Sequence, residues 1–163
     1  MKILVVLVIC FSVFSCKSDS NTASQKQAEP LSTQKAQAPE FERIPDETIM
    51  RLWNECTLID YIFHDLPFSM NQGEQASIRT NLTYIDGNVQ ANIPAGCKPM
   101  ARQFYQIEGE IVYEADVYYS DNCKFYVFYD GDKKYANKMS NDGMQFFNTM
   151  ISKALDARKQ MGQ

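Results

Sequence analysis

The spacing of apolar residues along the chain changes several times, and each spacing predicts a different element. From residue 49 to residue 66 apolar side chains recur at every third or fourth position, which predicts an amphipathic helix. Pro45 and Asp46-Glu47 suit its first turn, and Pro67 ends it. The apolar stripe consists of Ile49, Leu52, Trp53, Cys56, Ile59, Ile62, Phe63 and Leu66.

The next segment alternates between apolar and polar residues, which is the period of a strand. Residues 76–84 follow this pattern, Asp86-Gly87 is typical of a hairpin turn, and residues 89–93 predict a short return strand. The stretch from Pro94 to Pro99 breaks the pattern, so we expect an irregular loop or bulge there.

Four further strands and a helix complete the pattern. The strands are predicted at residues 100–107, 110–119, 124–129 and 133–138, and Ser140 is a candidate N-cap for a helix that runs through Leu155. The order is therefore helix, antiparallel meander of five or six strands, helix. Helices that flank a meander pack most simply on one face of the sheet, which predicts a two-layer α+β sandwich. This order is similar to that of cystatin-like folds.

The strand at residues 110–119 predicts a candidate binding face. We assign Ile111, Tyr113, Ala115, Val117 and Tyr119 to the core. The opposite face would then combine carboxylates with aromatic rings of this strand and the next, a mixture that suits recognition of a polypeptide or a sugar. The alternative is that cross-strand aromatic pairs simply stabilise a solvated face. The predicted binding face consists of Glu114, Asp116, Tyr118, Tyr126 and Phe128.

The N-terminus predicts export. Lys2 precedes an apolar run from residue 3 to residue 14, whose length of about 18 Å as a helix is too short to cross a membrane. Val13-Phe14-Ser15-Cys16, which ends this run, resembles the lipobox of bacterial lipoproteins. The resemblance implies a signal peptide at residues 1–15 and acyl chains on Cys16, which would anchor the protein in a membrane of the cell envelope. Lys17-Ser18-Asp19 resembles a tether that directs lipoproteins to the outer membrane.

Composition divides the rest of the chain into a linker and one domain. Residues 16–40 are rich in Ser, Gln and Ala and contain no aromatic residue, so we expect a disordered linker. Residues 41–163 hold the periodic segments and form a single domain. The whole chain is 45% apolar and 22% charged, which is globular usage.

Three cysteines remain after Cys10 leaves with the signal peptide and Cys16 takes lipid. Cys56 lies on the apolar stripe of the first helix. Cys97 and Cys123 precede two strands that run in the same direction, so both lie at one end of the sheet. Strands two places apart are about 9.6 Å apart, yet both cysteines lie in connections that can bend inward, and we expect a disulfide between them.

Charge and motifs argue against several functional classes. The net charge of −4 disfavours nucleic acid as a partner, and the single histidine excludes sites built from several imidazoles. Asp60, His64 and Asp65 offer metal-capable side chains, but a further ligand is missing, so we expect no metal, no cofactor and no catalysis. Asp130-Gly131-Asp132 is typical of a turn rather than of a calcium-binding loop. We interpret the glycosylation sequon at Asn81 as a chance match.

These features favour a noncatalytic, lipid-anchored domain of the cell envelope that binds a protein partner or belongs to an assembly. Capture of a glycan or small ligand on the predicted binding face is the alternative. An enzyme that uses Asp60, His64 and Asp65 is a third hypothesis.

Overall fold

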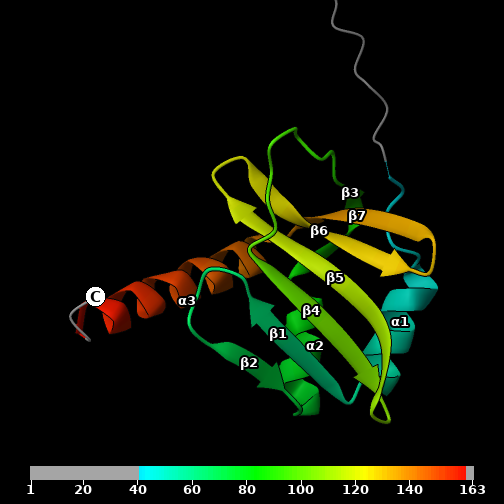
Figure 1. Cartoon of the computed structure of the whole chain (residues 1–163). Helices are drawn as coiled ribbons and strands as arrows, with labels where there is room; N and C mark the ends of the chain where they lie inside the picture. Colours follow the sequence, from blue (N-terminus) through cyan, green and yellow to red (C-terminus); the bar gives the residue numbers. More distant parts are fainter. Residues whose placement is uncertain (1–40, 161–163) are drawn as a thin grey trace, which may run out of the picture. The chain divides into compact units, whose positions relative to one another are not determined.

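The described part of the chain, residues 41–160 of a computed structural model, contains three helices and seven strands (Figure 1). The predicted signal peptide, lipidation at Cys16 and linker lie outside these residues. The strands form one antiparallel sheet in the order β2-β1-β4-β5-β6-β7-β3, which confirms the predicted α+β sandwich with more strands than expected. The elements are α1 (Asp46–Glu55), β1 (Leu58–Phe63), β2 (Ser69–Gln72), α2 (Gln75–Leu82), β3 (Ile85–Gln90), β4 (Ala101–Ile107), β5 (Glu110–Ser120), β6 (Cys123–Asp130), β7 (Lys133–Met139) and α3 (Asn141–Gln160).

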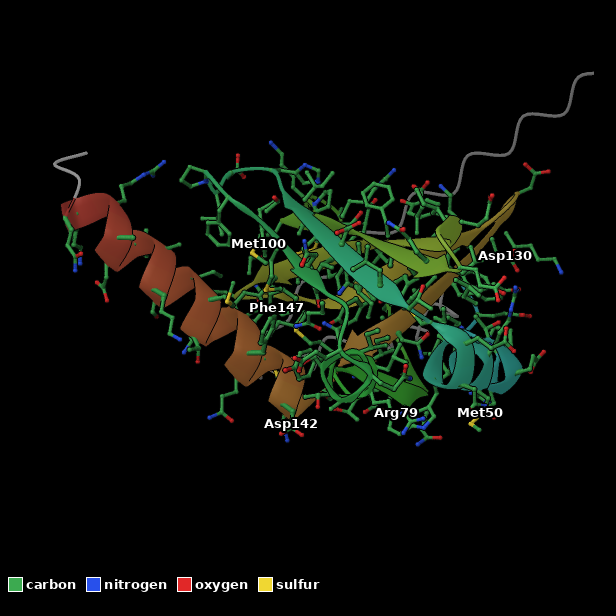
Figure 2. All side chains as sticks on the ribbon, turned by 90° about the horizontal axis from the view of Figure 1, so that it is seen from below. Met50, Arg79, Met100, Asp130, Asp142 and Phe147 are labelled. Atoms are coloured by element: carbon green, nitrogen blue, oxygen red, sulfur yellow. A yellow bond between two sulfur atoms is a disulfide. The ribbon has the colours of Figure 1, made fainter. Side chains whose placement is uncertain are left out.

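All three helices cover the same side of the sheet, which we call the helix side. In Figure 2, Met50, Arg79 and Asp142, one residue from each helix, lie on this side. The main core fills the space between the two layers, because each helix contributes a buried apolar residue that packs on inward side chains of the strands. The helix residues of this core are Leu52, Ile78, Leu82 and Phe147, Cys56 joins them directly after α1, and α3 extends past the sheet (Figure 1).

The predicted first helix is wrong in its second half. Helix α1 ends at Glu55, Cys56 is already extended with ψ 127°, and residues 58–63 form β1 between β2 and β4. Ile59, Tyr61 and Phe63 are buried and also follow a period of two. Apolar residues three or four apart therefore fit either element here, and pairing on both edges favours the strand.

The second correction concerns the predicted strand at residues 76–84, which is helix α2. Ile78 and Leu82 are one helical turn apart, and both are buried in the main core. In a short segment with alternating apolar residues, every second apolar position is four residues from the last, which also fits one face of a helix. Packing in the folded protein therefore decides between strand and helix. The return strand also shifts: β3 begins at Ile85, and Asp86-Gly87 lies within it instead of forming a hairpin turn.

The later predictions agree closely with the structure. Strands β4 to β7 are a meander with the predicted connections, including the turn at Glu108-Gly109, where both residues have positive φ. Ser140 caps α3 as expected, since its Oγ accepts a hydrogen bond from the Gly143 amide at 3.1 Å.

The other side of the sheet, which we call the outer side, is covered only in part. Over β6 and β7 a smaller apolar cluster forms under Phe41 and the β3–β4 connection. This connection contains Ile93 and Cys97, and both pack against the cluster. The outer side therefore differs from one half of the sheet to the other, which decides where a site can lie. The buried members of the cluster are Ala91, Cys123, Phe125, Val127 and Ala136.

Candidate functional site on the outer side of the sheet

Two residues of the predicted binding face, Tyr126 and Phe128, lie on the helix side instead. Tyr126 pairs with Val117 and Phe128 pairs with Ala115, so all four side chains point into the main core. Both rings are 0% exposed, and the Tyr126 hydroxyl is buried without a hydrogen-bond partner among the described residues. The assignment of these two rings to a binding face is therefore wrong.

The reason is the register between β5 and β6. Ser120 pairs with Cys123 across a two-residue turn, which places Phe125, Val127 and Tyr129 opposite Tyr118, Asp116 and Glu114. Because side chains alternate along a strand, a shift by one residue moves a whole set to the other side of the sheet. The short turn at Asp121-Asn122 was the signal in the sequence that fixes this register.

The predicted acids are on the outer side, where they form a charged cluster with Arg102 of β4. Arg102 Nε donates to Asp116 Oδ1 at 2.8 Å, and Arg102 Nη1 donates to Glu114 Oε2 at 3.2 Å. The Tyr129 hydroxyl donates to Asp116 Oδ2 at 2.6 Å, and the guanidinium lies over the Tyr129 ring at 5.2 Å. Both oxygens of Asp116 are therefore engaged by neighbouring strands, and Glu114 is paired with Arg102 through one of its two oxygens.

Two members of this cluster, Arg102 and Tyr129, have raised pKa values. The hydrogen bond to Asp116 raises the pKa of Arg102, so the guanidinium stays charged. Burial, followed by the hydrogen bond to Asp116, raises the pKa of Tyr129, so its hydroxyl keeps the proton that it donates. The cluster therefore connects β4, β5 and β6 through side chains on the outer side.

Tyr118 is the only predicted aromatic residue that remains on the outer side. Its ring stacks on Phe125 at 4.5 Å and packs against the cluster under the β3–β4 connection. It is half-buried, so it offers less surface than an exposed ring. The glycan alternative thereby loses two of its three predicted rings.

The predicted disulfide is confirmed. Cys97 and Cys123 are bonded, with their Cα atoms 5.9 Å apart. This is shorter than the spacing of alternate strands because Cys97 lies in the β3–β4 connection, which bends over the sheet. The bond fixes this connection over the β6 and β7 half of the outer side. Cys56 is a free, buried thiol, and burial raises its pKa.

The candidate catalytic residues are not brought together. Asp60 lies in β1, where its Oδ2 accepts a hydrogen bond from Gln106 Nε2 at 2.8 Å, while His64 and Asp65 follow in the exposed turn. Within residues 41–160 no three His, Cys, Asp or Glu residues lie close enough to hold a metal ion.

Two shorter motifs are also placed. Asp130-Gly131-Asp132 forms the turn between β6 and β7, and Gly131 has φ 58°, as predicted. Asn81 is buried in α2 and donates through Nδ2 to the Tyr61 hydroxyl and to Gln72 Oε1. The Asn81 amide nitrogen is therefore engaged in hydrogen bonds inside the protein.

A hollow of about 400 Å³, which the sequence pattern does not predict, lies beside the charged cluster. Ser69 and Asn71 of the edge strand β2 form one rim. The side chains of β1, β4 and β5 that line the hollow on the outer side define a surface that we call the open face. The open face consists of Asp60, Ile62, Phe104, Gln106 and Ile111.

Two isoleucines make the open face apolar. Ile62 is 51% exposed and Ile111 is 54% exposed. Ile111 had been expected in the core, but the β4–β5 register shifts between Tyr105 and Gln106. This bulge leaves Val112 without a partner and turns Ile111 outward beside Gln106. Strict alternation along residues 110–119 hides such a bulge, so this part of the site has no signal in the sequence pattern.

Comparisons with protein-family models, with curated proteins and with solved structures found no match to this chain. Among the helices of the described residues, none combines the length and the hydropathy that a membrane span requires.

Proposed function

We propose that this chain is a noncatalytic, lipid-anchored protein of the cell envelope and that it binds a protein partner on the open face. The lipid anchor follows from the lipobox resemblance at Cys16, and Lys17-Ser18-Asp19 favours the outer membrane. The observation that carries the partner site is the pair of half-exposed isoleucines, Ile62 and Ile111, beside a hollow in an uncovered part of the sheet.

Single exposed apolar side chains are common on protein surfaces, so the positions of these side chains relative to one another matter more than their number. Ile62 and Ile111 flank Phe104, and the three side chains line one hollow that neither the helices nor the β3–β4 connection covers. Adjacent apolar side chains around a depression are the surroundings in which an anchoring side chain of a partner is buried.

The charges around the hollow define the chemistry of the partner. Within residues 41–160, Asp60 is the only charged residue that lines the hollow, and one of its oxygens accepts a hydrogen bond from Gln106. The neighbouring acids are already paired with Arg102. The occupant that fits is therefore a protein segment with an aliphatic or aromatic side chain for the hollow and a Lys or Arg beside it for Asp60.

The edge strand β2 supports the same occupant. It forms one rim of the hollow, carries no charged residue and pairs with β1 on one side only. An uncharged edge leaves backbone donors and acceptors available to an extended segment. A partner strand that approaches β2 would bring alternate side chains next to the open face.

A photo-reactive amino acid at position 111 tests this proposal in intact cells. We expect p-benzoylphenylalanine at this position to attach reproducibly to one protein, and mass spectrometry to find an apolar residue next to Lys or Arg in the attached segment. Position 155 on α3 is the matched control, because Leu155 is 47% exposed and does not line the hollow.

The controls decide between outcomes. Attachment from position 111 without attachment from position 155 supports the open face as the partner site. Equal attachment from both positions, or none from position 111 in abundant folded protein, contradicts it.

A further inference from the structure

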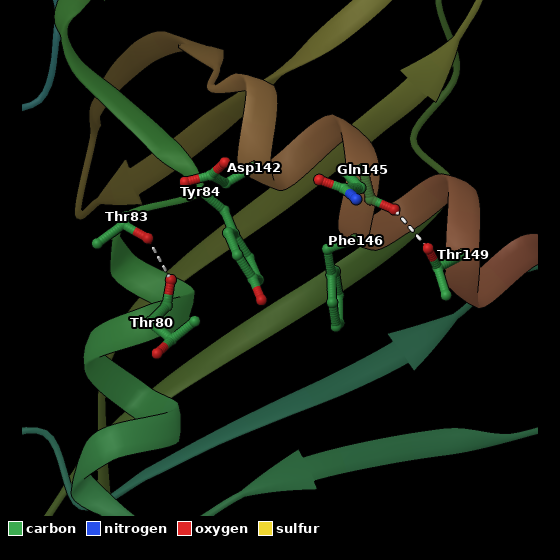
Figure 3. A pocket seen from close by; sticks show the side chains of 7 residues that line it. All are labelled: Thr80, Thr83, Tyr84, Asp142, Gln145, Phe146 and Thr149. Atoms are coloured by element: carbon green, nitrogen blue, oxygen red, sulfur yellow. Dashed lines mark hydrogen bonds between the residues drawn. The ribbon is translucent and has the colours of Figure 1, made fainter.

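A second cleft lies on the helix side, between the end of α2 and the first half of α3, and nothing in the proposed function uses it. Its volume is about 340 Å³. Figure 3 shows that Thr80 of α2 and Thr83, directly after α2, border it on one side, while Gln145 and Thr149 border it from α3. The remaining lining residues are Tyr84, Asp142 and Phe146.

The two helices are held at a fixed spacing at one end of the cleft. The Ser140 amide donates to the Tyr84 carbonyl at 2.8 Å, and Ser140 Oγ donates to the Thr83 carbonyl at 2.8 Å. Gly143 permits this approach, because a Cβ atom there would lie 2.8 Å from the Tyr84 carbonyl oxygen. The turn after α2 is thus hydrogen-bonded directly to the residue that precedes α3, which fixes this end of the cleft.

Two aromatic rings line the cleft. Tyr84 and Phe146 stack on one another with centroids 4.8 Å apart and planes inclined by 25°, and both are half-buried (Figure 3). Phe146 also contacts Phe147 at 5.1 Å, edge to face, which ties the pair to the main core. The rings therefore offer a firm apolar surface next to polar groups.

The polar groups around these rings are mainly acceptors. The hydroxyls of Thr80, Thr83 and Thr149 donate to backbone carbonyls of α2, α2 and α3, at 2.9, 2.7 and 2.9 Å, so their oxygens remain free to accept. Within residues 41–160 the side chains of Asp142 and Gln145 make no hydrogen bond to another side chain. Burial, followed by the charge of Asp142, raises the pKa of Tyr84, which keeps its phenol neutral.

This lining selects a ligand with many donors and an apolar face. Asp142 is the only charged group among the seven lining residues of the described chain, so a phosphate or another anion does not fit. A sugar ring presents several hydroxyl donors at its edge and a C–H surface on its face. We propose that the α2–α3 cleft is a binding site for a neutral monosaccharide unit, with Asp142, Gln145 and the threonine oxygens as acceptors and the Tyr84–Phe146 pair as the apolar wall.

The site is independent of the partner site, since the two lie on opposite sides of the sheet. Ligand-detected NMR of the purified full chain, by saturation transfer, tests it with two probes, methyl β-D-glucopyranoside and N-acetyl-D-glucosamine. We expect saturation of the C–H protons of at least one sugar, with millimolar affinity. Benzyltrimethylammonium serves as a cationic comparator, because rings and a carboxylate also attract cations.

Matched variants locate the binding. Thr149→Arg places a long side chain in the cleft. Asn148→Arg introduces the same side chain at the neighbouring exposed position, which does not line the cleft. We expect at least tenfold weaker sugar binding in Thr149→Arg and less than a twofold change in Asn148→Arg. The proposal is overturned if neither sugar binds, if only the ammonium compound binds, or if the two variants weaken sugar binding equally.

Discussion

The outer side of the sheet has two halves that differ in what covers them. Over β6 and β7, Phe125 and Val127 are buried under the disulfide-bonded β3–β4 connection. Over β1, β4 and the start of β5, no described segment lies on Ile62 and Ile111, which stay half-exposed beside the hollow. Apolar side chains of the same sheet thus have a structural role in one half and are available to a partner in the other.

This difference also shows how one strand serves both halves. Strand β5 carries exposed Ile111 near its start and reaches Ala115, Asp116 and Val117, which are all buried. The bulge at Val112 separates the two parts, because it changes which side of the sheet the first residues face. A binding surface can therefore arise at the end of a core strand without weakening its centre.

The largest expected effect separates the helix side from the open face. Phe128→Ala removes a ring that is 0% exposed, and we expect a loss of about 3–5 kcal/mol in the free energy of unfolding. Phe104→Ala on the half-buried open face should cost about 1 kcal/mol. Urea denaturation of both variants measures the difference, and equal losses would show that the two rings are not distinguished by their side of the sheet.

The next effect concerns the cover itself. Replacing Cys97 and Cys123 by Ser opens a loop with a sequence separation of 26, which should cost about 3–4 kcal/mol in the chain-entropy description. We also expect the double substitution to increase the hydrogen-exchange rates of β6 and β7 amides more than those of β1 amides. A uniform increase across the sheet would mean that the disulfide does not serve the covered half specifically.

High pH should act on the helix side through its tyrosines. Burial raises the pKa values of Tyr61, Tyr105 and Tyr126 above the ordinary value of 10.0. A raised pKa contributes stability below the unfolded value and loses it as the pH rises toward the folded value. Stability should therefore decline above pH 10 by about 1.4 kcal/mol per pH unit for each such tyrosine.

Absorbance at 295 nm and circular dichroism, followed together, measure this decline. Ionisation of the buried tyrosines should coincide with the loss of folded structure. Full ionisation near pH 10 in a chain that is still folded would contradict their burial.

The sequence predicted the meander and the last helix because their signals are local, and the disulfide because the meander places Cys97 and Cys123 at one end of the sheet. Ser140 marks a helix start, Gly131 marks a turn, and the later strands carry enough residues to define a period. Residues 58–63 and 75–82 are short and fit two periods, so only their pairing and packing in the folded protein decide between helix and strand.

The candidate site was harder to predict than the fold. Glu114, Asp116 and Tyr118 lie on the outer side as expected, but Tyr126 and Phe128 do not, because face assignment depends on register. The open face depends on the bulge at Val112 and on what the β3–β4 connection leaves uncovered. Both are tertiary properties that alternation along one strand does not encode.

The smallest expected change in stability accompanies the most direct test. Ile62→Ser with Ile111→Ser alters side chains that are about half-exposed, so each substitution should change the free energy of unfolding by about 0.5 kcal/mol or less. The matched control is Met50→Ser with Leu155→Ser, which removes two side chains of 55% and 47% exposure on the helices. Neither pair touches the charged cluster around Arg102.

The decisive measurement is crosslinking in intact cells followed by mass spectrometry, with the native chain and the two double variants as bait. The account predicts a stoichiometric protein partner on the native chain and on Met50→Ser/Leu155→Ser, and its loss from Ile62→Ser/Ile111→Ser at equal abundance. Retention of the same partner by Ile62→Ser/Ile111→Ser would contradict the open face as the binding site.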